Sequence, residues 1–408
     1  MTTFPFAFAM AGGEGRTEIL WMMLAVFGSA KLLAELFERL GLPGIAGEIL
    51  AGILIGPSLL GWVAPGEVIR TMAELGVMFL LFRVGLEVEV AELTKLGGTA
   101  LIVGVLGVVV PFATGWGLFQ LLGRPPLESI FVGAALTATS VGITAQVLAS
   151  KGLLHRPAAR IILGAAVIDD VLALLILGAA SSFATGTVNL MQLGLTTAFA
   201  VVFVVLVARW GRATVRTVMP RLESRLQVGE AQFSLAMVLL FGLAVLSAKA
   251  GVAAIIGAFL AGLALSGTLP RRIHDLAQGV TELLVPFFLA SIGLQFSLAA
   301  FANWSTFLLA LLLVPAAVLS KLIGCGLGAS HLGREVAMRV GLGMIPRGEF
   351  CMVVARAGLT LHAISPATYR MIVFMAVAAA MLTPPLLKVA FRGVLAPPPE
   401  TEDVFRIG

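Results

Sequence analysis

The chain alternates between long apolar blocks and short polar stretches along almost its whole length. An apolar block of about 20 residues, coiled as an α-helix, spans the roughly 30 Å hydrocarbon core of a bilayer. Glycine, proline and charged residues gather between the blocks, where helices end and turns form. The pattern predicts an all-α polytopic membrane protein, because lipid offers no hydrogen-bond partner to a free peptide group.

We predict thirteen transmembrane helices, numbered here as spans in chain order. The spans are residues 18–38, 43–60, 72–89, 98–121, 127–149, 159–182, 190–209, 229–249, 251–266, 280–297, 304–329, 335–359 and 367–393. The proline-rich tail from Pro397 to Gly408 is not expected to fold.

The composition agrees with a membrane protein. Hydrophobic residues make up 59% of the chain and charged residues only 12%, whereas a soluble domain carries about 25% charged residues. The net charge of +5 does not indicate a nucleic-acid partner, because the arginines lie at span ends rather than in one patch. Cys325 and Cys351 are expected to pack as small apolar side chains, so no disulfide, zinc site or cofactor is predicted.

Lysine and arginine mark one side of the membrane. They are concentrated in the loops after odd-numbered spans and in the C-terminal tail, and they are sparse in the other loops. The positive-inside rule therefore places the N-terminus outside and the C-terminus in the cytoplasm.

Two halves of the sequence resemble each other. Residues 45–52 (IAGEILAG) are echoed by residues 255–262 (IIGAFLAG), and residues 79–86 (FLLFRVGL) by residues 287–294 (FFLASIGL). Spans two to six thus resemble spans nine to thirteen. Span two begins the first repeat and span nine begins the second, and these two spans are an odd number of spans apart. The five-helix repeats are therefore predicted to be inverted, as in many secondary transporters.

Two adjacent carboxylates, Asp169 and Asp170, lie near the middle of the span at residues 159–182. A charge at that depth is costly, and each carboxylate opposes ionisation of the other. They must pair, take up protons or bind a cation. We predict that they form an ion- and proton-binding site and bind Na+ transiently as a metal ligand pair.

Two further groups are candidates for the same site. Lys321 lies inside the span at residues 304–329, and we predict that it pairs with one aspartate rather than reaching the membrane surface. The hydroxyls of Thr137, Thr139 and Ser140 either line a broken helix at the site or bond back to the preceding turn.

A second broken helix is predicted within residues 335–359, where Pro346 stands between glycines. Arg347 and Glu349 beside it would neutralise the half-helix ends or pair with each other.

The remaining charges within spans have open roles. Glu48, Glu74 and Arg83 lie in the second and third spans, where Arg83 would form a structural pair with Glu74 or Glu87. The histidines lie at loops or span ends and are expected to be solvated, with His155 a candidate sensor of cytoplasmic pH.

With these motifs the chain resembles bacterial sodium/proton antiporters of the cation–proton antiporter superfamily, most of all the NapA type. The resemblance covers all thirteen spans, and its specific elements are Lys321 and residues 137–144 (TATSVGIT), 161–170 (IILGAAVIDD) and 346–349 (PRGE). It implies an NhaA/NapA-like fold with two broken, crossing helices. Arg83 departs from the family pattern, in which an apolar residue is expected.

The resemblance also implies roles for the site residues. Asp170 would bind the ion or the proton, and Asp169 would pair with Lys321. Thr139 and Ser140 would lie in the unwound crossing helix. A pair of aspartates, in place of an asparagine and an aspartate, implies electrogenic exchange.

A division of the chain follows from the same resemblance. Residues 1–97 and 229–300 would form a dimerisation domain, and residues 98–182 and 301–393 a mobile core domain. Residues 183–228 would be a linker helix and cytoplasmic loop, and residues 394–408 a cytoplasmic tail. A homodimer in the bacterial cytoplasmic membrane is expected.

The sequence thus predicts a secondary transporter, not an enzyme, that exchanges protons for Na+, Li+ or K+ by elevator-type alternating access. One alternative is a sodium-coupled symporter of an organic anion on a related fold. Another is an intramembrane aspartyl protease, but that needs an aspartate on each of two helices, whereas here both lie on one.

Overall fold

The structure of the chain, a computed structural model, describes residues 16–88, 96–185, 190–223, 230–250, 253–298 and 303–392. All regular elements within these residues are helical. The proline-rich tail that we expected not to fold lies outside the described residues. The elements in chain order are α1 (Arg16–Arg39), α2 (Gly44–Ile55), α3 (Glu67–Glu87), α5 (Gly97–Leu121), α6 (Pro126–Thr137), α7 (Val141–Ser150), α8 (Pro157–Thr185), α9 (Leu190–Glu223), α10 (Ala231–Lys249), α11 (Ala254–Leu265), α12 (Arg271–Leu294), α13 (Trp304–Gly328), the 3-10 turn η2 (Ser330–Leu332), α14 (Arg334–Gly343), α15 (Glu349–Thr360) and α16 (Pro366–Ala390).

The all-α prediction is confirmed, and each predicted span contains a helix or a pair of helices. Among the described residues, eight helical segments are long and apolar enough to cross a membrane. The helices α2, α11 and α15 are shorter, and α3 carries several charged residues. The number of thirteen crossings therefore stays a prediction.

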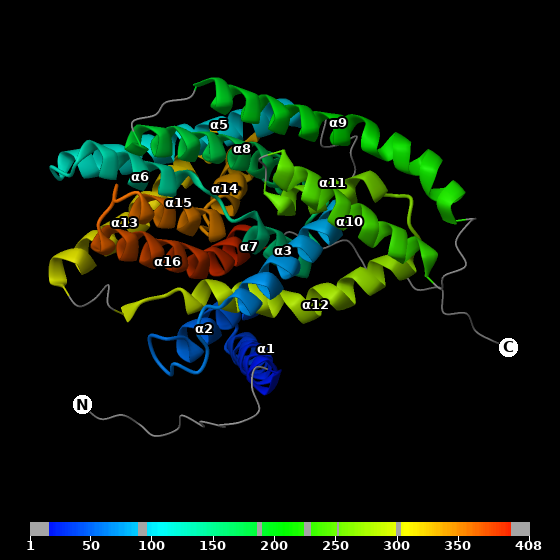
Figure 1. The fold of residues 1–408 in the computed structure, drawn as a ribbon, viewed down its shortest axis with the longest axis horizontal. Coiled ribbons are helices and arrows are strands. Elements are labelled where there is room, and N and C mark those ends of the chain that lie inside the picture. The colour runs from blue at the N-terminus through cyan, green and yellow to red at the C-terminus, as the bar shows by residue number, and fades with distance from the viewer. Residues whose placement is uncertain are drawn as a thin grey trace.

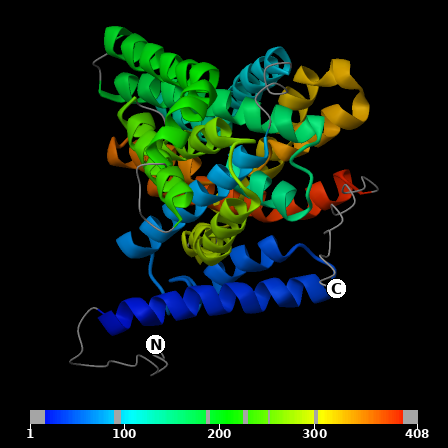
Figure 2. The same cartoon turned by 90° about the vertical axis from the view of Figure 1, so that its right-hand side faces the viewer.

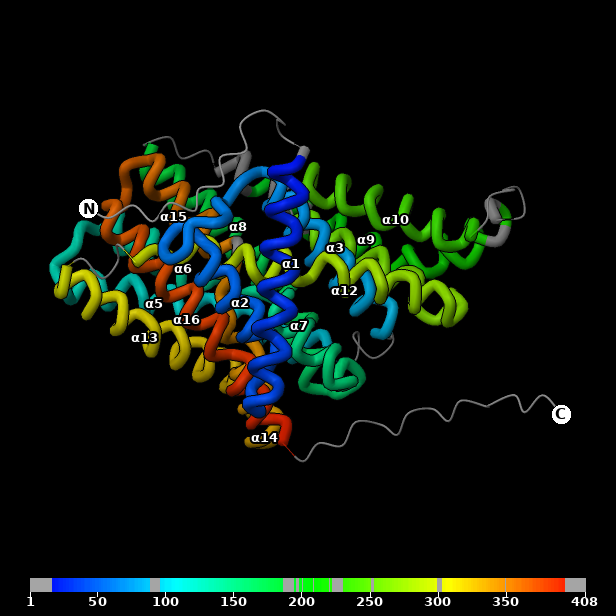
Figure 3. Tube along the Cα trace, turned by 90° about the horizontal axis from the view of Figure 1, so that it is seen from below, coloured from blue at the N-terminus to red at the C-terminus, as the bar shows by residue number. Residues whose placement is uncertain are grey.

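The helices pack in two groups that lie side by side (Figures 1 and 3). The α3 group contains α1, α2, α3, α10, α11 and α12, with α3 packed against both α11 and α12. The α8 group contains α5 to α8 and α13 to α16, with α5 packed against α6, α8 and α13. The two groups meet where α3 contacts α7 and where α2 contacts α16.

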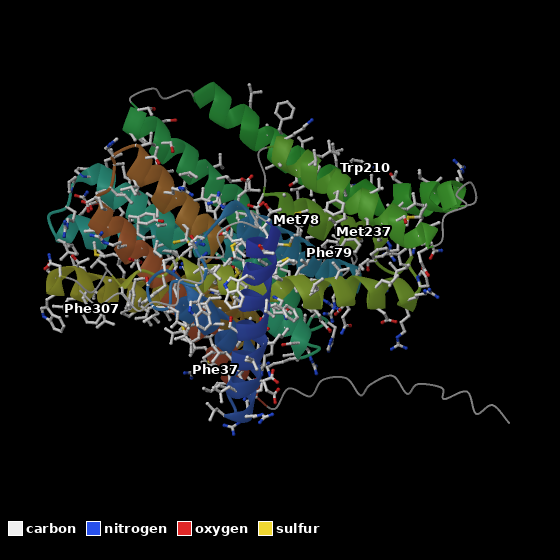
Figure 4. The ribbon with its side chains drawn as sticks, turned by 60° about the horizontal axis from the view of Figure 1, so that its bottom comes forward. Phe37, Met78, Phe79, Trp210, Met237 and Phe307 are labelled. Atoms are coloured by element: carbon white, nitrogen blue, oxygen red, sulfur yellow. The ribbon has the colours of Figure 1, made fainter. Side chains whose placement is uncertain are left out.

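The helix α1 lies along one edge of the molecule beside α2 (Figure 2). On the other side of the α3 group, Met78 and Phe79 of α3 lie in an apolar cluster with Met237 of α10 (Figure 4). Trp210 of α9 is about half exposed, as are many large apolar side chains of α1, α5, α9 and α10. Such a surface is stable in lipid but not in water.

The linker region differs from its prediction. We expected the seventh span to end at residue 209 and an arginine-rich cytoplasmic loop to follow. Instead α9 continues as one helix to Glu223 and carries Arg209, Arg212, Arg216 and Arg221 on its last turns. Arginine has a high helix propensity, so the basic composition of this stretch does not end the helix. α9 contacts α8 of one group and α10 and α11 of the other.

Glycines allow the helices of the α3 group to cross with their main chains in contact. A methyl group at Gly52 would lie 1.9 Å from the carbonyl oxygen of Ala290, and one at Gly262 would lie 2.0 Å from that of Phe82. Both distances are far inside van der Waals contact, and a main-chain carbonyl cannot turn aside. Only glycine fits at these crossings.

We therefore expect Gly52→Ala to destabilise the protein by more than the roughly 1–3 kcal/mol usual for overpacking. Gly242→Ala on α10, where a methyl group would meet nothing within 4 Å, should leave the melting temperature unchanged or slightly raised. Thermal unfolding in detergent compares the two variants. Equal melting temperatures would show that α2 and α12 are not held in this contact.

Candidate ion-binding site

The predicted aspartates lie near the middle of α8 and inside the α8 group. Asp169 is fully buried, and Asp170 is 7% exposed. The residues before them, such as Ala165 and Ala166, are small and buried, so neighbouring helices approach closely at this level. On the described residues, the Asp170 side chain forms no hydrogen bond.

Lys321 forms the buried ion pair that the sequence suggested. Its Nζ atom donates to Oδ1 of Asp169 at 2.7 Å, and both side chains are fully buried. The other oxygen of Asp169, Oδ2, is buried without a hydrogen-bond partner among the described residues. The pair neutralises one aspartate, and among the described residues Asp170 has no cationic partner at hydrogen-bond distance.

Two interrupted helices cross beside the aspartates. α6 ends at Thr137 and α7 begins at Val141, while α14 ends at Gly343 and α15 begins at Glu349. The main chains of the two interruptions bond to each other, with Ser140 N donating to Pro346 O at 2.8 Å. The interruptions predicted from the hydroxyl-rich stretch and from Pro346 are thus present and in contact.

The hydroxyl groups at the first interruption differ in what they bind. Thr139 Oγ1 donates to Met344 O at 3.4 Å, and Thr144 Oγ1 donates to Gly343 O at 2.6 Å. Each therefore satisfies a carbonyl group that the end of α14 leaves free. Thr137 Oγ1 bonds back to Ala134 O in its own helix, which is the alternative that we left open for this stretch.

Arg347 lies in the second interruption and is fully buried. Its guanidinium group donates to the carbonyl oxygens of Met344, Ile345 and Ala317. A cation at the C-terminal end of α14 complements the negative end of the helix dipole. The expectation that Arg347 neutralises a half-helix end therefore agrees with these contacts. Glu349 is the first residue of α15, and its side chain lies outside the described part of the structure.

Asp170 faces a small cavity at the junction of the two groups. The cavity is lined by Leu81 of α3, Val141 of α7, Phe259 of α11 and the face of α8 around Asp170. Asp170 is the single ionisable residue among those that line it. The carboxylate therefore lies where a small ion could reach it from between the groups.

The other charged residues of the spans lie away from this site. Arg83 pairs with Glu87 at 3.4 Å, one of the two partners considered, while Glu74 is exposed. Glu48 is buried and pairs with Lys31 of α1 at 3.2 Å.

Sequence reasoning missed the contacts of three residues. Glu128 is buried at the start of α6, where it accepts a hydrogen bond from Thr368 of α16. Gly107 of α5 lies against the ion pair, and Cys325 lies beside it rather than merely in an apolar surrounding. A buried glutamate in the first turn of a span can be noticed in the sequence, but one glycine among 46 cannot.

The fold is that of a membrane ion transporter of known structure. The sodium/proton antiporter MjNhaP1 from Methanocaldococcus jannaschii superposes with a TM-score of 0.67 at 19% sequence identity. The match covers 93% of this chain and 98% of that structure. At this level of identity the similarity concerns the fold alone.

The chain belongs to the sodium/hydrogen exchanger family, whose transmembrane profile matches residues 22–392. The Na+/H+-K+ antiporter GerN of Bacillus cereus is 35% identical over 92% of this chain and 96% of its own length. The Na+/H+ antiporter of Enterococcus hirae is 31% identical over 93% of this chain and 100% of its own length. The high-affinity Na+/H+ antiporter NhaS3 of a Synechocystis strain is 33% identical over 92% of this chain and 90% of its own length. The resemblance noted from the motifs is thus confirmed for the family.

The ion pair can be tested by its effect on stability. Lys321→Met leaves the Asp169 carboxylate buried without its partner, which typically costs about 3–5 kcal/mol. Adding Asp169→Asn removes that charge, so the double variant should recover most of the melting temperature. Unfolding in detergent is the measurement, and a Lys321→Met protein as stable as the wild type would contradict a buried, charged pair.

Proposed function

We propose that this protein exchanges protons for sodium, or another monovalent cation, across a membrane, and that Asp170 binds the two in turn. The observation that carries the proposal is the position of Asp170. It faces a cavity between two helix groups, it is adjacent to a neutralised aspartate, and it has no cationic partner at hydrogen-bond distance in the part of the chain that the structure describes. Relatives that are 31–35% identical over most of the chain carry the names of Na+/H+ antiporters, which supports the same activity here.

The mechanism follows from competition for the carboxylates. Without a bound cation, Lys321 holds Asp169 and a proton occupies Asp170. A cation entering the cavity takes hard oxygen ligands, with Asp170 and the free Oδ2 of Asp169 as its anionic donors. Thr139, Ser140 and carbonyl groups of the interrupted helices would complete the shell. Once Asp169 binds the cation, Lys321 loses its partner and can release its proton.

Electrogenic exchange is part of this proposal. If both Asp170 and Lys321 release protons for each cation bound, the exchange moves net charge across the membrane. The support is the direct bond between Lys321 and Asp169, which links cation binding to the protonation of Lys321.

Transport would proceed by an elevator-type movement of the α8 group against the α3 group. In these terms residues 98–182 and 301–393 form the mobile core, and residues 1–97 and 229–300 form the domain that holds a homodimer together. The groups meet through few helices, and the cavity at Asp170 lies between them. Both features support movement at this junction, since backbone glycine contacts lock α2, α3, α11 and α12 within one group.

The inverted repeat is supported by matched contacts. Gly52 lies on Ala290 O of α12, and its counterpart Gly262 lies on Phe82 O of α3. Gly262 lies 210 positions after Gly52, and Ala290 lies 208 positions after Phe82. The same crossing thus occurs twice, each time between a helix of one half and a helix of the other, as expected when each half contributes one repeat.

The proposed location is the bacterial cytoplasmic membrane, with the N-terminus outside. Contacts between loops support the assignment of sides. Lys388 donates to Gly41 O, and Arg272 pairs with Glu230. Each of these contacts joins two regions that the positive-inside rule puts in the cytoplasm. The Thr368 bond to Glu128 joins two regions assigned to the outside.

The two alternatives to cation/proton exchange find less support. An organic anion would need a cationic or donor-rich pocket, whereas the residues around Asp170 are apolar. A protease that shares one proton between aspartates is disfavoured, because Lys321 occupies Asp169.

Asp170→Asn is expected to abolish exchange, because an amide neither releases a proton nor offers an anionic ligand. The variant should remain folded, since the amide is a close match in shape. The measurement is dequenching of a pH dye in proteoliposomes when each cation is added, with the potential clamped or free. Glu74→Gln, an exposed change on α3, is the control, and exchange at the wild-type rate by Asp170→Asn would overturn the assignment.

Movement between the groups can be tested by cross-linking. Leu81→Cys on α3 and Val167→Cys on α8 line the same cavity from the two groups. Oxidation to a disulfide should stop exchange, and reduction should restore it. In the matched control, Leu81→Cys is combined with Phe259→Cys, both within the α3 group, and oxidation should have little effect. Exchange that continues while α3 is bonded to α8 would exclude the elevator movement.

A further inference from the structure

The helix α5 lies directly behind the Lys321–Asp169 pair and presents glycine there. A methyl group at Gly107 would lie 2.7 Å from Cys325 Sγ, 3.5 Å from Lys321 Nζ and 3.8 Å from Asp169 Oδ1. The first distance is shorter than any real carbon contact of this kind, and the other two are ordinary van der Waals contacts. The space occupied by the pair therefore depends on the absence of a side chain at position 107.

Cys325 forms the other wall of this space. It lies on α13 four residues after Lys321, one turn further along the same face of the helix, and it is fully buried. A methyl group at Gly107 would be in reach of its Sγ atom, of Lys321 Nζ and of Asp169 Oδ1 alike. The thiol thus lies beside the pair, against the same glycine.

The helices around this space are already in close contact. Gly324 of α13 would place a methyl group 2.6 Å from Leu106 O, and Gly328 would place one 2.8 Å from Val103 Cα. On the side of α8, a methyl group at Gly104 would lie 2.9 Å from Ile168 Cγ2, directly before Asp169. α5 is therefore in close contact with both helices that carry the pair, and crowding at position 107 must be relieved by side chains.

We propose that Gly107 and Cys325 are positioning residues that set how tightly Lys321 holds Asp169, and thereby the affinity for the cation. This inference rests on the proposed function. A larger side chain at position 107 displaces the thiol into the space of the Lys321 side chain and crowds the paired state. The cation-bound state, in which Lys321 has left Asp169, becomes relatively more favourable.

Gly107→Ala should therefore lower the apparent KM for sodium, by roughly tenfold if the crowding is of the size usual for overpacking. A change that only loosened the fold would lower the maximal rate and leave KM unchanged. Proteoliposome assays over a series of sodium concentrations give KM and the maximal rate separately.

The rescue variant removes the atom that is crowded. Gly107→Ala combined with Cys325→Ala eliminates the 2.7 Å contact and keeps the two ordinary ones, so KM should return towards the wild-type value. Gly117→Ala on the same helix, where a methyl group meets nothing within 4 Å, should behave as the wild type. Sodium-dependent thermal stabilisation in detergent should follow the same order without requiring transport.

The outcomes separate this inference from the proposed function. If the wild type shows no proton flux on addition of any monovalent cation, the proposed function fails. If the wild type exchanges but Gly107→Ala keeps its KM, or if Cys325→Ala does not restore it, only the role of Gly107 and Cys325 fails. Should Gly107→Ala not fold, Cys325→Val crowds the same space from α13 and must shift KM in the same direction.

Discussion

The ion pair between Lys321 and Asp169 is the interaction on which the rest of the site depends. Both groups are fully buried, and an isolated buried charge is several times more costly than an isolated buried dipole. A direct bond of 2.7 Å compensates Lys321 and one oxygen of Asp169. Among the described residues, no cation bonds to Oδ2 of Asp169 or to the neighbouring Asp170, and the buried Arg347 bonds to main-chain carbonyls instead. These carboxylate oxygens are therefore open to a proton or a cation that enters.

The same shortage of partners explains why the two interrupted helices cross beside the aspartates. An interruption in lipid would leave free carbonyl and amide groups at four helix ends. Here the two interruptions bond to each other through Ser140 and Pro346, and the Thr144 hydroxyl and the Arg347 guanidinium group bind carbonyls at the end of α14. Extended backbone is thereby kept next to the carboxylates at little cost in unsatisfied polar groups. A continuous helix would offer no carbonyl oxygens there.

The sequence was most informative where physics makes a residue costly. Asp169, Asp170, Lys321 and Arg347 stand out because charges are rare in apolar spans, and the structure places all four in the buried interior of the α8 group. It was least informative where a residue acts by being small or unreactive. Gly107 and Cys325 look like dozens of other apolar positions, and only the crossing of α5 and α13 gives them a place beside the pair. The length of α9 was also misjudged, because arginines suit a helix at the membrane surface as well as a loop.

Main-chain contacts within the α3 group and side-chain contacts at its junction with the α8 group differ in how they respond to movement. Within the α3 group, glycines bring main chains together at Gly52 and Gly262, where no side chain can yield, so these helices must move as one body. At the junction with the α8 group, the walls of the cavity are apolar side chains such as Leu81 and Phe259, which form no directional bonds across the boundary. A surface of this kind can slide with little change in free energy, provided that Asp170 does not cross it as a bare carboxylate. In the proposed elevator movement, Asp170 would cross with a proton or a cation bound, so the chemistry of the carboxylate would control when the junction moves.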